Sequence, residues 1–436
     1  MITHEEALNY HSQIYRGKLE IMPVKPCSTQ KELSLAYTPG VAAACRAIAA
    51  DPDQGWDLTG RGNLVAVISN GTAVLGLGNI GPLAGKPVME GKGVLFKILA
   101  DVDVYDLNIQ QSDPEKIVEF IKMLEPTFGG INIEDIKAPE CFMIEQRCIQ
   151  DMDIPIFHDD QHGTAIISGA GLLNALEIIG KKIKDIKVVV SGAGASAIAC
   201  ATFYVSLGVQ SKNVFMFDSK GLLHKGRLDL TPEKFSFAHD KNYGNLTQVM
   251  AGADCFLGLS VADAITPEMV ASMGKQPIIF ACANPDPEIP YTVAKKTRPD
   301  CIMATGRSDF PNQINNVLGF PFIFRGALDV RARKINEAMK VAATQALAAL
   351  AKEPVPNEIK AAYGVNDMEF GMEYIIPKPF DNRVLEWEST AVAQAAMDTG
   401  VAQLPIADLG VYKATLRKRL AESKRRIAAH IRSYGL

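Results

Sequence analysis

The chain has 436 residues, of which 47% are hydrophobic and 22% charged, and its formal net charge is −4. This composition excludes a disordered, collagen-like or coiled-coil protein, and the slightly acidic balance gives no electrostatic support for nucleic acid binding. We expect a cytoplasmic protein that does not bind membranes, because no run reaches the ~18 uninterrupted apolar residues of a spanning helix and the N-terminus lacks signal-peptide features.

The first part of the chain alternates predicted helices and strands. A helix is expected over residues 1–20, followed by a connector that contains prolines. Apolar runs and alternating patterns then predict strands at 63–69, 102–109, 131–133 and 154–157, and a helix at 113–125. Strands that alternate with helices indicate an α/β architecture.

A second α/β unit is predicted after residue 160. Its expected elements are helices at 163–180, 195–207, 326–351 and 411–433, and strands at 186–190, 214–217, 253–257, 278–281 and 302–304. We divide the chain into an N-terminal α/β domain (1–160), a doubly wound nucleotide-binding domain (161–400) and a C-terminal helical segment (401–436). The last segment could fold back onto the first domain.

Two glycine motifs match a dinucleotide-binding fingerprint. Gly76–Gly81 matches G-x-G-x-x-G letter for letter, and Gly192–Ala197 matches the variant that ends in Ala. The fingerprint works only between a strand and a helix, whose N-terminal N–H groups face the pyrophosphate. Prolines and glycines in residues 82–93 would break a helix after the first motif, whereas residues 195–207 follow the second as a clean helical pattern. We therefore assign the dinucleotide to the second motif and expect the first to form a tight active-site loop.

The residues after the second motif give conflicting signals about the cofactor. Asp218, at the end of the next strand, occupies the position of a ribose-binding carboxylate and favours NAD. The cations Lys220, Lys225 and Arg227 follow at once, and positive charge there would hold the 2′-phosphate of NADP. We expect NADP, with NAD as the alternative.

Two pairs of carboxylates follow predicted strands, Glu134-Asp135 and Asp159-Asp160. Carboxylates that converge at the carboxyl ends of strands form a hard oxygen site for Mg²⁺ or Mn²⁺. The alternative is that the first pair is solvated and that the second caps the next helix. A zinc site is less favoured, because the His158/His162 spacing lacks the glutamate of H-E-x-x-H.

Two further residues are candidates for proton transfer. Lys92 is flanked by glycines that could bring it close to a ligand, where a desolvated lysine can act as a base, and the alternative is an exposed loop lysine. Tyr37, before Thr-Pro-Gly, is either a core aromatic or a proton donor. The eight cysteines are scattered without a CxxC pair, which predicts reduced, buried thiols.

Several motifs together are similar in order and spacing to those of the malic enzyme family, over most of the chain. They are Leu35–Gly40 (LAYTPG), Val74–Gly81 (VLGLGNIG), Asn132–Ile136 (NIEDI), His158–Thr164 (HDDQHGT), Ser191–Ala195 (SGAGA), Thr127–Asn132 and Gln313–Asn316. The resemblance is closest to bacterial members, some of which carry a C-terminal phosphotransacetylase-like region. It implies an α/β fold with an N-terminal malic domain and a Rossmann-type NAD(P)-binding domain.

The resemblance also implies an activity, the oxidative decarboxylation of (S)-malate to pyruvate and CO₂ with reduction of NAD(P)⁺ and a need for Mg²⁺ or Mn²⁺. The implied site residues are Glu134, Asp135 and Asp160 as metal ligands, Lys92 as general base, Tyr37 as general acid, Asp159 beside the ligands, Gly192, Ala193, Gly194 and Ala195 at the pyrophosphate, and Asn284 and Asn316 at malate, Asn284 also near the cofactor.

Some questions stay open at this stage. The arginine that holds a malate carboxylate in larger eukaryotic members is missing from residues 70–76, and Arg307 and Arg325 are candidates to replace it. A metal-independent dehydrogenase of the amino-acid type and a non-enzymatic nucleotide-responsive regulator are the competing interpretations. We expect a homodimer or higher homo-oligomer, and a further domain beyond Leu436 stays open.

Overall fold

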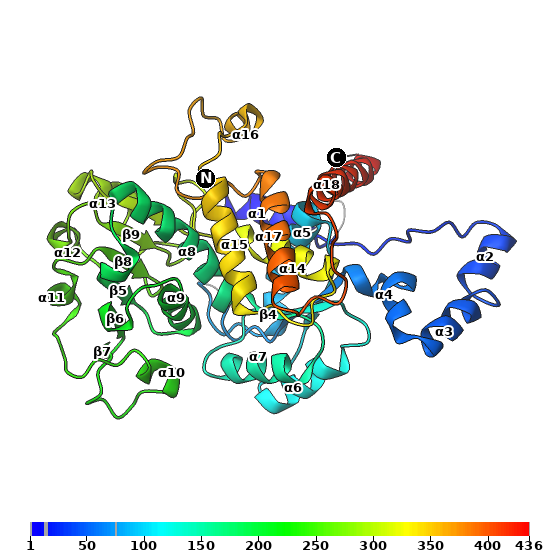
Figure 1. Ribbon diagram of the computed structural model, residues 1–436, viewed down its shortest axis with the longest axis horizontal. Helices are drawn as coiled ribbons and strands as arrows, with labels where there is room; N and C mark the ends of the chain where they lie inside the picture. The colour runs from blue at the N-terminus through cyan, green and yellow to red at the C-terminus, as the bar shows by residue number, and fades with distance from the viewer. Residues whose placement is uncertain (1, 13–15, 75, 436) are drawn as a thin grey trace.

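Two sheets, each covered by helices, organise the computed structural model, which describes residues 2–12, 16–74 and 76–435 (Figure 1). The first sheet has the strand order β2-β1-β3-β4 and all its pairs are parallel. Its strands are β1 (Leu64–Ser69), β2 (Asp103–Asn108), β3 (Gly130–Ile133) and β4 (Ile156–His158). Alternate residues of β1 enter different cores: Val65 and Val67 pack with α5, whereas Ala66 and Ile68 pack with α6 (Pro114–Met123) and α7 (Glu140–Asp151).

The second sheet has six strands in the order β10-β9-β8-β5-β6-β7. They are β5 (Val188–Ser191), β6 (Val214–Asp218), β7 (Gly221–Leu222), β8 (Cys255–Gly258), β9 (Ile278–Ala281) and β10 (Ile302–Thr305). Only β7 runs antiparallel among the described strands of this sheet. Because β5 lies between β6 and β8, the strand order reverses at β5, and α9 (Ala195–Ser206) begins at that point. Such a reversal is where doubly wound sheets bind ligands.

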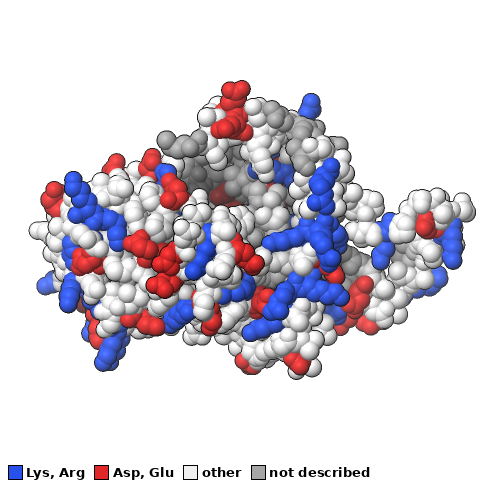
Figure 2. All heavy atoms as spheres, turned by 90° about the horizontal axis from the view of Figure 1, so that it is seen from above, with Lys and Arg blue, Asp and Glu red and all other residues white. Residues whose placement is uncertain are grey.

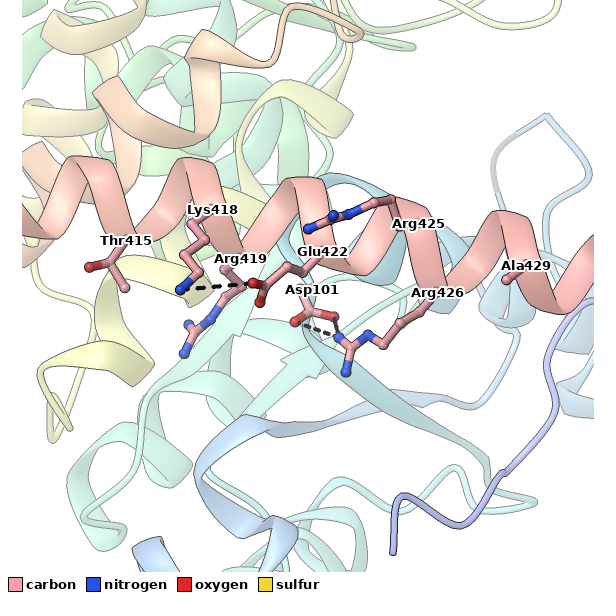
Figure 3. Close-up of a pocket in the computed structure, with 8 residues that line it drawn as sticks. All are labelled: Asp101, Thr415, Lys418, Arg419, Glu422, Arg425, Arg426 and Ala429. Atoms are coloured by element: carbon pink, nitrogen blue, oxygen red, sulfur yellow. Dashed lines mark hydrogen bonds and ion pairs between the residues drawn. The ribbon is translucent and has the colours of Figure 1, made fainter.

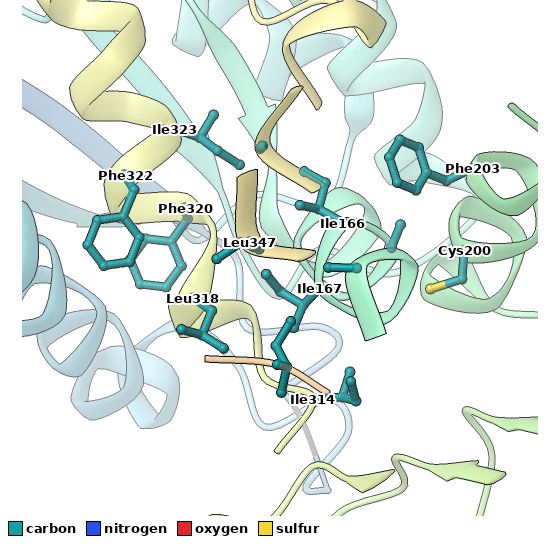
Figure 4. Close-up of a cluster of buried hydrophobic side chains, with 14 of the residues drawn as sticks. Ile166, Ile167, Cys200, Phe203, Ile314, Leu318, Phe320, Phe322, Ile323 and Leu347 are labelled. Atoms are coloured by element: carbon teal, nitrogen blue, oxygen red, sulfur yellow. The ribbon is translucent and has the colours of Figure 1, made fainter. Parts of the chain in front are cut away.

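The helix α8 (Asp159–Ile179) joins the two sheets and lies in the largest core. Ile166 and Ile167 of this helix lie between Phe203 of α9 on one side and Phe320 on the other (Figure 4). The helices α14 (Phe320–Asp329), α15 (Glu337–Leu350) and α17 (Arg383–Asp398) complete this layer. By length and hydropathy α8 passes a test for a membrane-spanning helix, but 67% of the tested window is buried inside the protein, as expected of a core helix.

Three helical predictions were wrong in detail. The helix expected at 1–20 is α1 (His4–Ser12); residues 16–20 are not helical, and residues 1 and 13–15 lie outside the described part. The helix expected at 326–351 is divided into α14 and α15, because Arg331 adopts a positive φ of 47° and the side chain of Asn336 caps the start of α15. The third is the prediction that prolines and glycines break any helix at residues 82–93, where the structure has a helix.

Residues 82–100 form one helix, α5 (Pro82–Ala100), where prolines and glycines had suggested a loop. Pro82 occupies the first turn, where the N–H group that proline lacks would have no helical partner. Its glycines serve close packing: a Cβ on Gly93 would lie 2.6 Å from the side chain of Leu19 and 3.3 Å from Val104 of the adjacent strand. Tertiary packing therefore outweighs the low helix propensity of these residues.

A helical arm projects from the body of the molecule (Figures 1 and 2). It consists of α2 (Gln30–Ala36), α3 (Val41–Ala50) and α4 (Gly55–Leu58), and α2 and α3 contain no buried residue. The stretch Gln30–Ala50 passes the same length and hydropathy test as α8 with 0% of its window buried, although residues 37–40 interrupt it between the two helices.

The C-terminal helix α18 (Leu409–Ser433) packs against α5 and α17, so the expected return to the first domain is confirmed. Asp101, just after α5, accepts a hydrogen bond from Ser423 (2.8 Å). It also pairs with Arg426 (3.2 Å), as Figure 3 shows. Basic side chains gather on this side of the surface (Figure 2). The remaining short elements are η1 (Pro52–Gln54), η2 (Gly60–Asn63), η3 (Ile183–Asp185), η4 (Ser211–Asn213), α10 (Pro232–Phe235), α11 (Leu246–Met250), α12 (Pro267–Ser272), α13 (Tyr291–Thr297), η5 (Asn316–Leu318) and α16 (Asn357–Ala362).

Candidate active site

Three carboxylates converge where β3 and β4 end. Glu134 and Asp135 follow β3, and Asp160 lies in the first turn of α8, directly after β4. These strands are parallel neighbours, so their carboxyl ends meet at one edge of the sheet. One oxygen from each carboxylate lies within 4.8 Å of the others. The structure therefore brings the three predicted metal ligands together.

The chemistry of this cluster fits a divalent cation. Burial, and then repulsion from Asp160 and Glu134, raises the pKa of Asp135 to about 9. Burial also raises the pKa of Asp160 to about 6 and that of Glu134 above its usual range. The Oδ2 atom of Asp135 is buried without a hydrogen-bond partner among the described residues. The three carboxylates repel one another, and one of their oxygens lacks a partner. A bound Mg²⁺ or Mn²⁺ would neutralise the repulsion and accept that oxygen as a ligand.

Lys92 lies at the edge of this cluster, on α5 and not in a loop. Its side chain is 8% exposed, and its Nζ atom is 2.6 Å from Asp159 Oδ2 and 2.9 Å from Glu134 Oε1. Burial lowers the pKa of Lys92, but the attraction of the two carboxylates outweighs burial and raises it. The alternative of an exposed loop lysine is excluded, and Lys92 is a buried cation between two acids.

Asp159 links Lys92 to Asn316. The Nδ2 atom of Asn316, at the start of η5, donates a hydrogen bond of 2.5 Å to Asp159 Oδ2. Asp159 is fully buried, which raises its pKa to about 7. A Cβ on Gly163 would come within 2.3 Å of Asp159 Oδ1, so this glycine leaves room for the carboxylate.

A cleft of about 550 Å³ lies at the reversal of strand order. Its lining includes Ser191, Gly192, Ala193 and Gly194 of the second glycine motif, Asp218, and Ala138 and Pro139 of the first domain. Gly192 has a φ of 120°, and a Cβ there would lie 2.4 Å from the carbonyl oxygen of Leu259. Ala195 begins α9. This strand, glycine turn and helix form the geometry that holds a pyrophosphate.

The charges around Asp218 differ from those expected. Arg227 pairs with both oxygens of Asp218 (2.8 and 2.9 Å), and Lys234 lies 3.1 Å from the second. Burial opposes ionisation, but Arg227, the backbone N–H of Lys220 (2.9 Å) and Lys234 outweigh it and lower the pKa of Asp218 to about 2. Lys234 lines the cleft, a residue that sequence reasoning missed because it comes 16 positions after Asp218, in α10.

Lys220 and Lys225 do not line the cleft. They are largely exposed, and they pair instead with Asp229 (2.8 Å) and Asp240 (2.6 Å).

The first glycine motif forms a tight loop, in which Gly76, Gly78 and Gly81 all have positive φ. A Cβ on Gly76 would lie 3.2 Å from the carbonyl oxygen of Asn284, so this loop of the first domain touches the segment after β9. The side chain of Asn284 donates to the carbonyl of Cys282 (3.1 Å). Asn284 thus stands between the two domains.

Other candidates lie apart from the cluster. Tyr37 ends α2 on the arm and is 70% exposed, so a single chain does not bring it to Lys92. Arg325 is 1% exposed and paired with Asp329 (2.6 Å), which excludes it as a malate ligand. Arg307 pairs with Asp309 near the carbonyl of Pro285.

His158 and His162 do not form a zinc site with the described residues. His158 is fully buried, its ring nitrogens make no hydrogen bond among the described residues, and its Nδ1 atom lies 3.8 Å from Asp160 Oδ2. His162 pairs with Glu145 (3.0 Å). All eight cysteines are free, six of them buried, and Cys27 and Cys45 are exposed.

Comparison with known proteins identifies both halves of the chain. Residues 16–149 match the family model described as malic enzyme, N-terminal domain, and residues 161–365 match malic enzyme, NAD binding domain. The NADP-dependent malic enzyme of Rhizobium meliloti is 55% identical over 99% of this chain, and that of Halomonas elongata 54% identical over 92%. This chain spans 57% of the Rhizobium protein and 95% of the Halomonas protein, so it covers little more than half the length of several curated relatives.

The fold matches as well as the sequence. The crystal structure of malic enzyme from Pyrococcus horikoshii is 41% identical, with a TM-score of 0.89 and 98% of each chain covered. The matches cover both sheets, the carboxylate cluster and the nucleotide cleft. This chain therefore belongs to the malic enzyme family.

Proposed function

We propose that the chain catalyses the oxidative decarboxylation of (S)-malate to pyruvate and CO₂, with reduction of NADP⁺ and with Mg²⁺ or Mn²⁺ as its metal. The observation that carries this proposal is the buried contact of Lys92 with Asp159 and Glu134 at the edge of the carboxylate cluster. Residues 138 and 139, which follow the cluster in the chain, line the nucleotide cleft. A base, a metal site and a cofactor cleft together are what oxidation of a 2-hydroxy acid requires.

Glu134, Asp135 and Asp160 would hold the metal through one oxygen each. A divalent cation bound there supplies Lewis-acid chemistry for the C2 oxygen of malate. The unpartnered Oδ2 atom of Asp135 supports this role, because a buried carboxylate oxygen without a partner is otherwise unfavourable. The main-chain N–H of Asp135 donates to Asp160 (2.7 Å) and orients that carboxylate.

Lys92 carries a proton in the contacts described above, so it would act as a base when the charge of a bound divalent cation lowers its pKa. The neutral amine would then accept the proton of the C2 hydroxyl while hydride leaves C2 for the nicotinamide. Asp159 holds the Lys92 nitrogen in place and is itself oriented by Asn316. Loss of CO₂ from the 2-oxo acid leaves an enolate, and Tyr37 would protonate its carbon. Each positioned proton transfer of this kind contributes about 10²–10⁴-fold to the rate.

A second copy of the chain would supply Tyr37. The arm exposes Leu33, Leu35, Tyr37 and Val41, and α2 and α3 bury none of their residues against the rest of the chain. Burial of these side chains in a homodimer would remove the exposed apolar surface and carry Tyr37 into a neighbouring site. We therefore propose a homo-oligomer, at least a dimer, with active sites completed between copies.

A cytoplasmic location is part of the same proposal, supported by eight cysteines that form no disulfide.

The cofactor of this proposal is NADP. In an NAD-specific site the strand-end carboxylate is free to bind the ribose hydroxyls. Here Arg227 and Lys234 occupy both oxygens of Asp218, and Lys234 brings a cation to the wall of the cleft. A 2′-phosphate would find Lys234 at its position, so this arrangement favours NADP over NAD.

Initial rates of reduced cofactor formation test the proposed function. Assays contain (S)-malate and Mn²⁺ with NADP⁺ or NAD⁺, each with an EDTA control. We expect metal-dependent formation of NADPH and pyruvate in equal amounts, faster with NADP⁺, and loss of this activity in Lys92→Ala. Reduction that continues in EDTA would indicate the metal-independent dehydrogenase, and no reduction with either cofactor would favour the regulator.

A further inference from the structure

Glu288 is a fully buried carboxylate near the nucleotide cleft whose function the proposed mechanism does not explain. It follows β9 in the loop that begins with Asn284, and it is 0% exposed. Its Oε1 atom accepts the backbone N–H of Ser260 (2.9 Å), and its Oε2 atom accepts the backbone N–H of Ala283 (3.0 Å). No cation pairs with it among the described residues. The donors to this carboxylate are these two main-chain N–H groups and the hydroxyl of Ser260, which donates to Oε1 (3.4 Å).

These two bonds connect the loops that leave adjacent strands. Ser260 follows β8 and Ala283 follows β9, so one side chain holds both backbones. Ser260 in turn bonds through its hydroxyl to Ser191 at the end of β5 (2.9 Å). Three neighbouring strand ends are therefore linked through Glu288 and Ser260.

Room for this carboxylate depends on a glycine. A Cβ on Gly258, the last residue of β8, would lie 2.3 Å from the carboxyl carbon of Glu288. No real Cβ approaches so closely, so any side chain at this position would displace the carboxylate. The position of the Glu288 carboxylate therefore depends on the absence of a side chain at Gly258.

The linked residues form part of the nucleotide site. Ser191 and Ser260 line the cleft, and Ala283 directly precedes Asn284, which touches the glycine loop of the first domain. We propose that Glu288 is a positioning residue that fixes the loops after β8 and β9 in the arrangement that binds the nicotinamide dinucleotide. The inference rests on the proposed function only in that the cleft binds this cofactor.

The test compares nucleotide binding to Glu288→Gln and to the wild-type chain. A glutamine presents one oxygen and one NH₂ group, so one backbone N–H loses its acceptor. We expect the Kd for NADPH, measured by fluorescence without malate, to rise about tenfold, the size expected for one lost buried hydrogen bond. The KM for NADP⁺ rises by the same factor, while kcat at saturating NADP⁺ stays within about twofold.

Glu388→Gln is the matched control, because Glu388 is an equally buried glutamate on α17 without a link to the cleft. It should leave the Kd for NADPH unchanged. Glu288→Asp keeps the charge but is too short to reach both N–H groups, and Gly258→Ala displaces the carboxylate without altering it. Both should weaken binding in the same direction, so the test does not depend on one variant folding.

An unchanged Kd for NADPH in a folded variant of Glu288 would overturn the proposal, as would an equal rise in the Glu388→Gln control. A wild-type chain that binds NADPH but does not oxidise malate would overturn the proposed function alone. A wild-type chain that binds no nucleotide would overturn both.

Discussion

The residue with the sharpest expected effect on cofactor choice is Lys234. Its Nζ atom lies 3.1 Å from Asp218 and it lines the nucleotide cleft. Lys234→Gln removes the cation that would meet the 2′-phosphate, so we expect kcat/KM for NADP⁺ to fall about 10–100-fold, as loss of one charged hydrogen bond predicts, with little change for NAD⁺. Lys220→Gln, at an exposed site outside the cleft, serves as control and should leave both values unchanged. An equal loss for both cofactors would contradict this account.

A second prediction at the residue scale concerns stability and pH. Burial raises the pKa of Glu388 well above its usual range, and neither of its oxygens has a partner among the described residues. The folded protein therefore retains a proton that the unfolded chain loses above about pH 4.5, so this group destabilises the fold increasingly as pH rises. We expect Glu388→Gln to raise Tm by at least about 2 °C at pH 8 and not to change it near pH 4.5. A constant shift at all pH values would exclude this cause.

At the scale of elements, apolar runs located most strands correctly. A parallel strand that is buried on both faces consists almost entirely of apolar residues, so a short apolar run marks its position. The runs around Val65–Ile68 and Val188–Val190 are fully buried in strands. The helix α5 was missed because its propensity is poor and its stability comes from packing against β2, which no local pattern reveals. The break before α15 depends on a positive φ at Arg331, a conformation that an arginine gives no reason to expect.

The attachment of α18 is a further element-scale prediction. Asp101 accepts from Ser423 and pairs with Arg426, and Asn at this position tolerates its φ of 50°. We expect Asp101→Asn to increase hydrogen exchange in residues 409–433 several-fold, because the charge that holds the helix is lost. Asp106→Asn is the control, since Asp106 pairs with Lys86 of α5 and not with α18. Unchanged exchange would mean that the other contacts of α18, among them the bonds of Tyr412 and Arg419 to Asp329, hold the helix without Asp101.

At the scale of the whole molecule, the sequence predicted which carboxylates form the cluster, but it did not predict every residue that surrounds the cluster and the nucleotide cleft. The two carboxylate pairs were located because they follow strands that end at one edge, and the family resemblance selected Glu134, Asp135 and Asp160 among them. Lys234 and Glu288 were missed because their positions depend on loops with no fixed spacing from the motifs. The location of Tyr37 on a projecting arm also depends on tertiary structure, since its helix has an ordinary capped sequence.

The arm leads to a prediction for the assembly. Tyr37→Phe and Lys92→Ala should each be inactive alone, because each site lacks one proton-transfer group. After mixing under conditions that exchange subunits, a mixed dimer with completed sites between copies contains one site with both native groups, so up to about a quarter of wild-type activity returns. No recovery, with exchange confirmed by native mass spectrometry, would mean that each chain uses its own Tyr37.

The central claim is that the three carboxylates beside Lys92 hold the metal on which malate oxidation depends. Titration of the purified chain with Mn²⁺, followed by electron paramagnetic resonance of the free ion and by malate-dependent NADPH formation in the same samples, tests it most directly. We predict one Mn²⁺ per chain, a rate that rises with occupancy, and loss of both in Asp160→Asn. Unchanged Mn²⁺ affinity in Asp160→Asn, or malate-dependent NADPH formation without bound metal, would contradict the account.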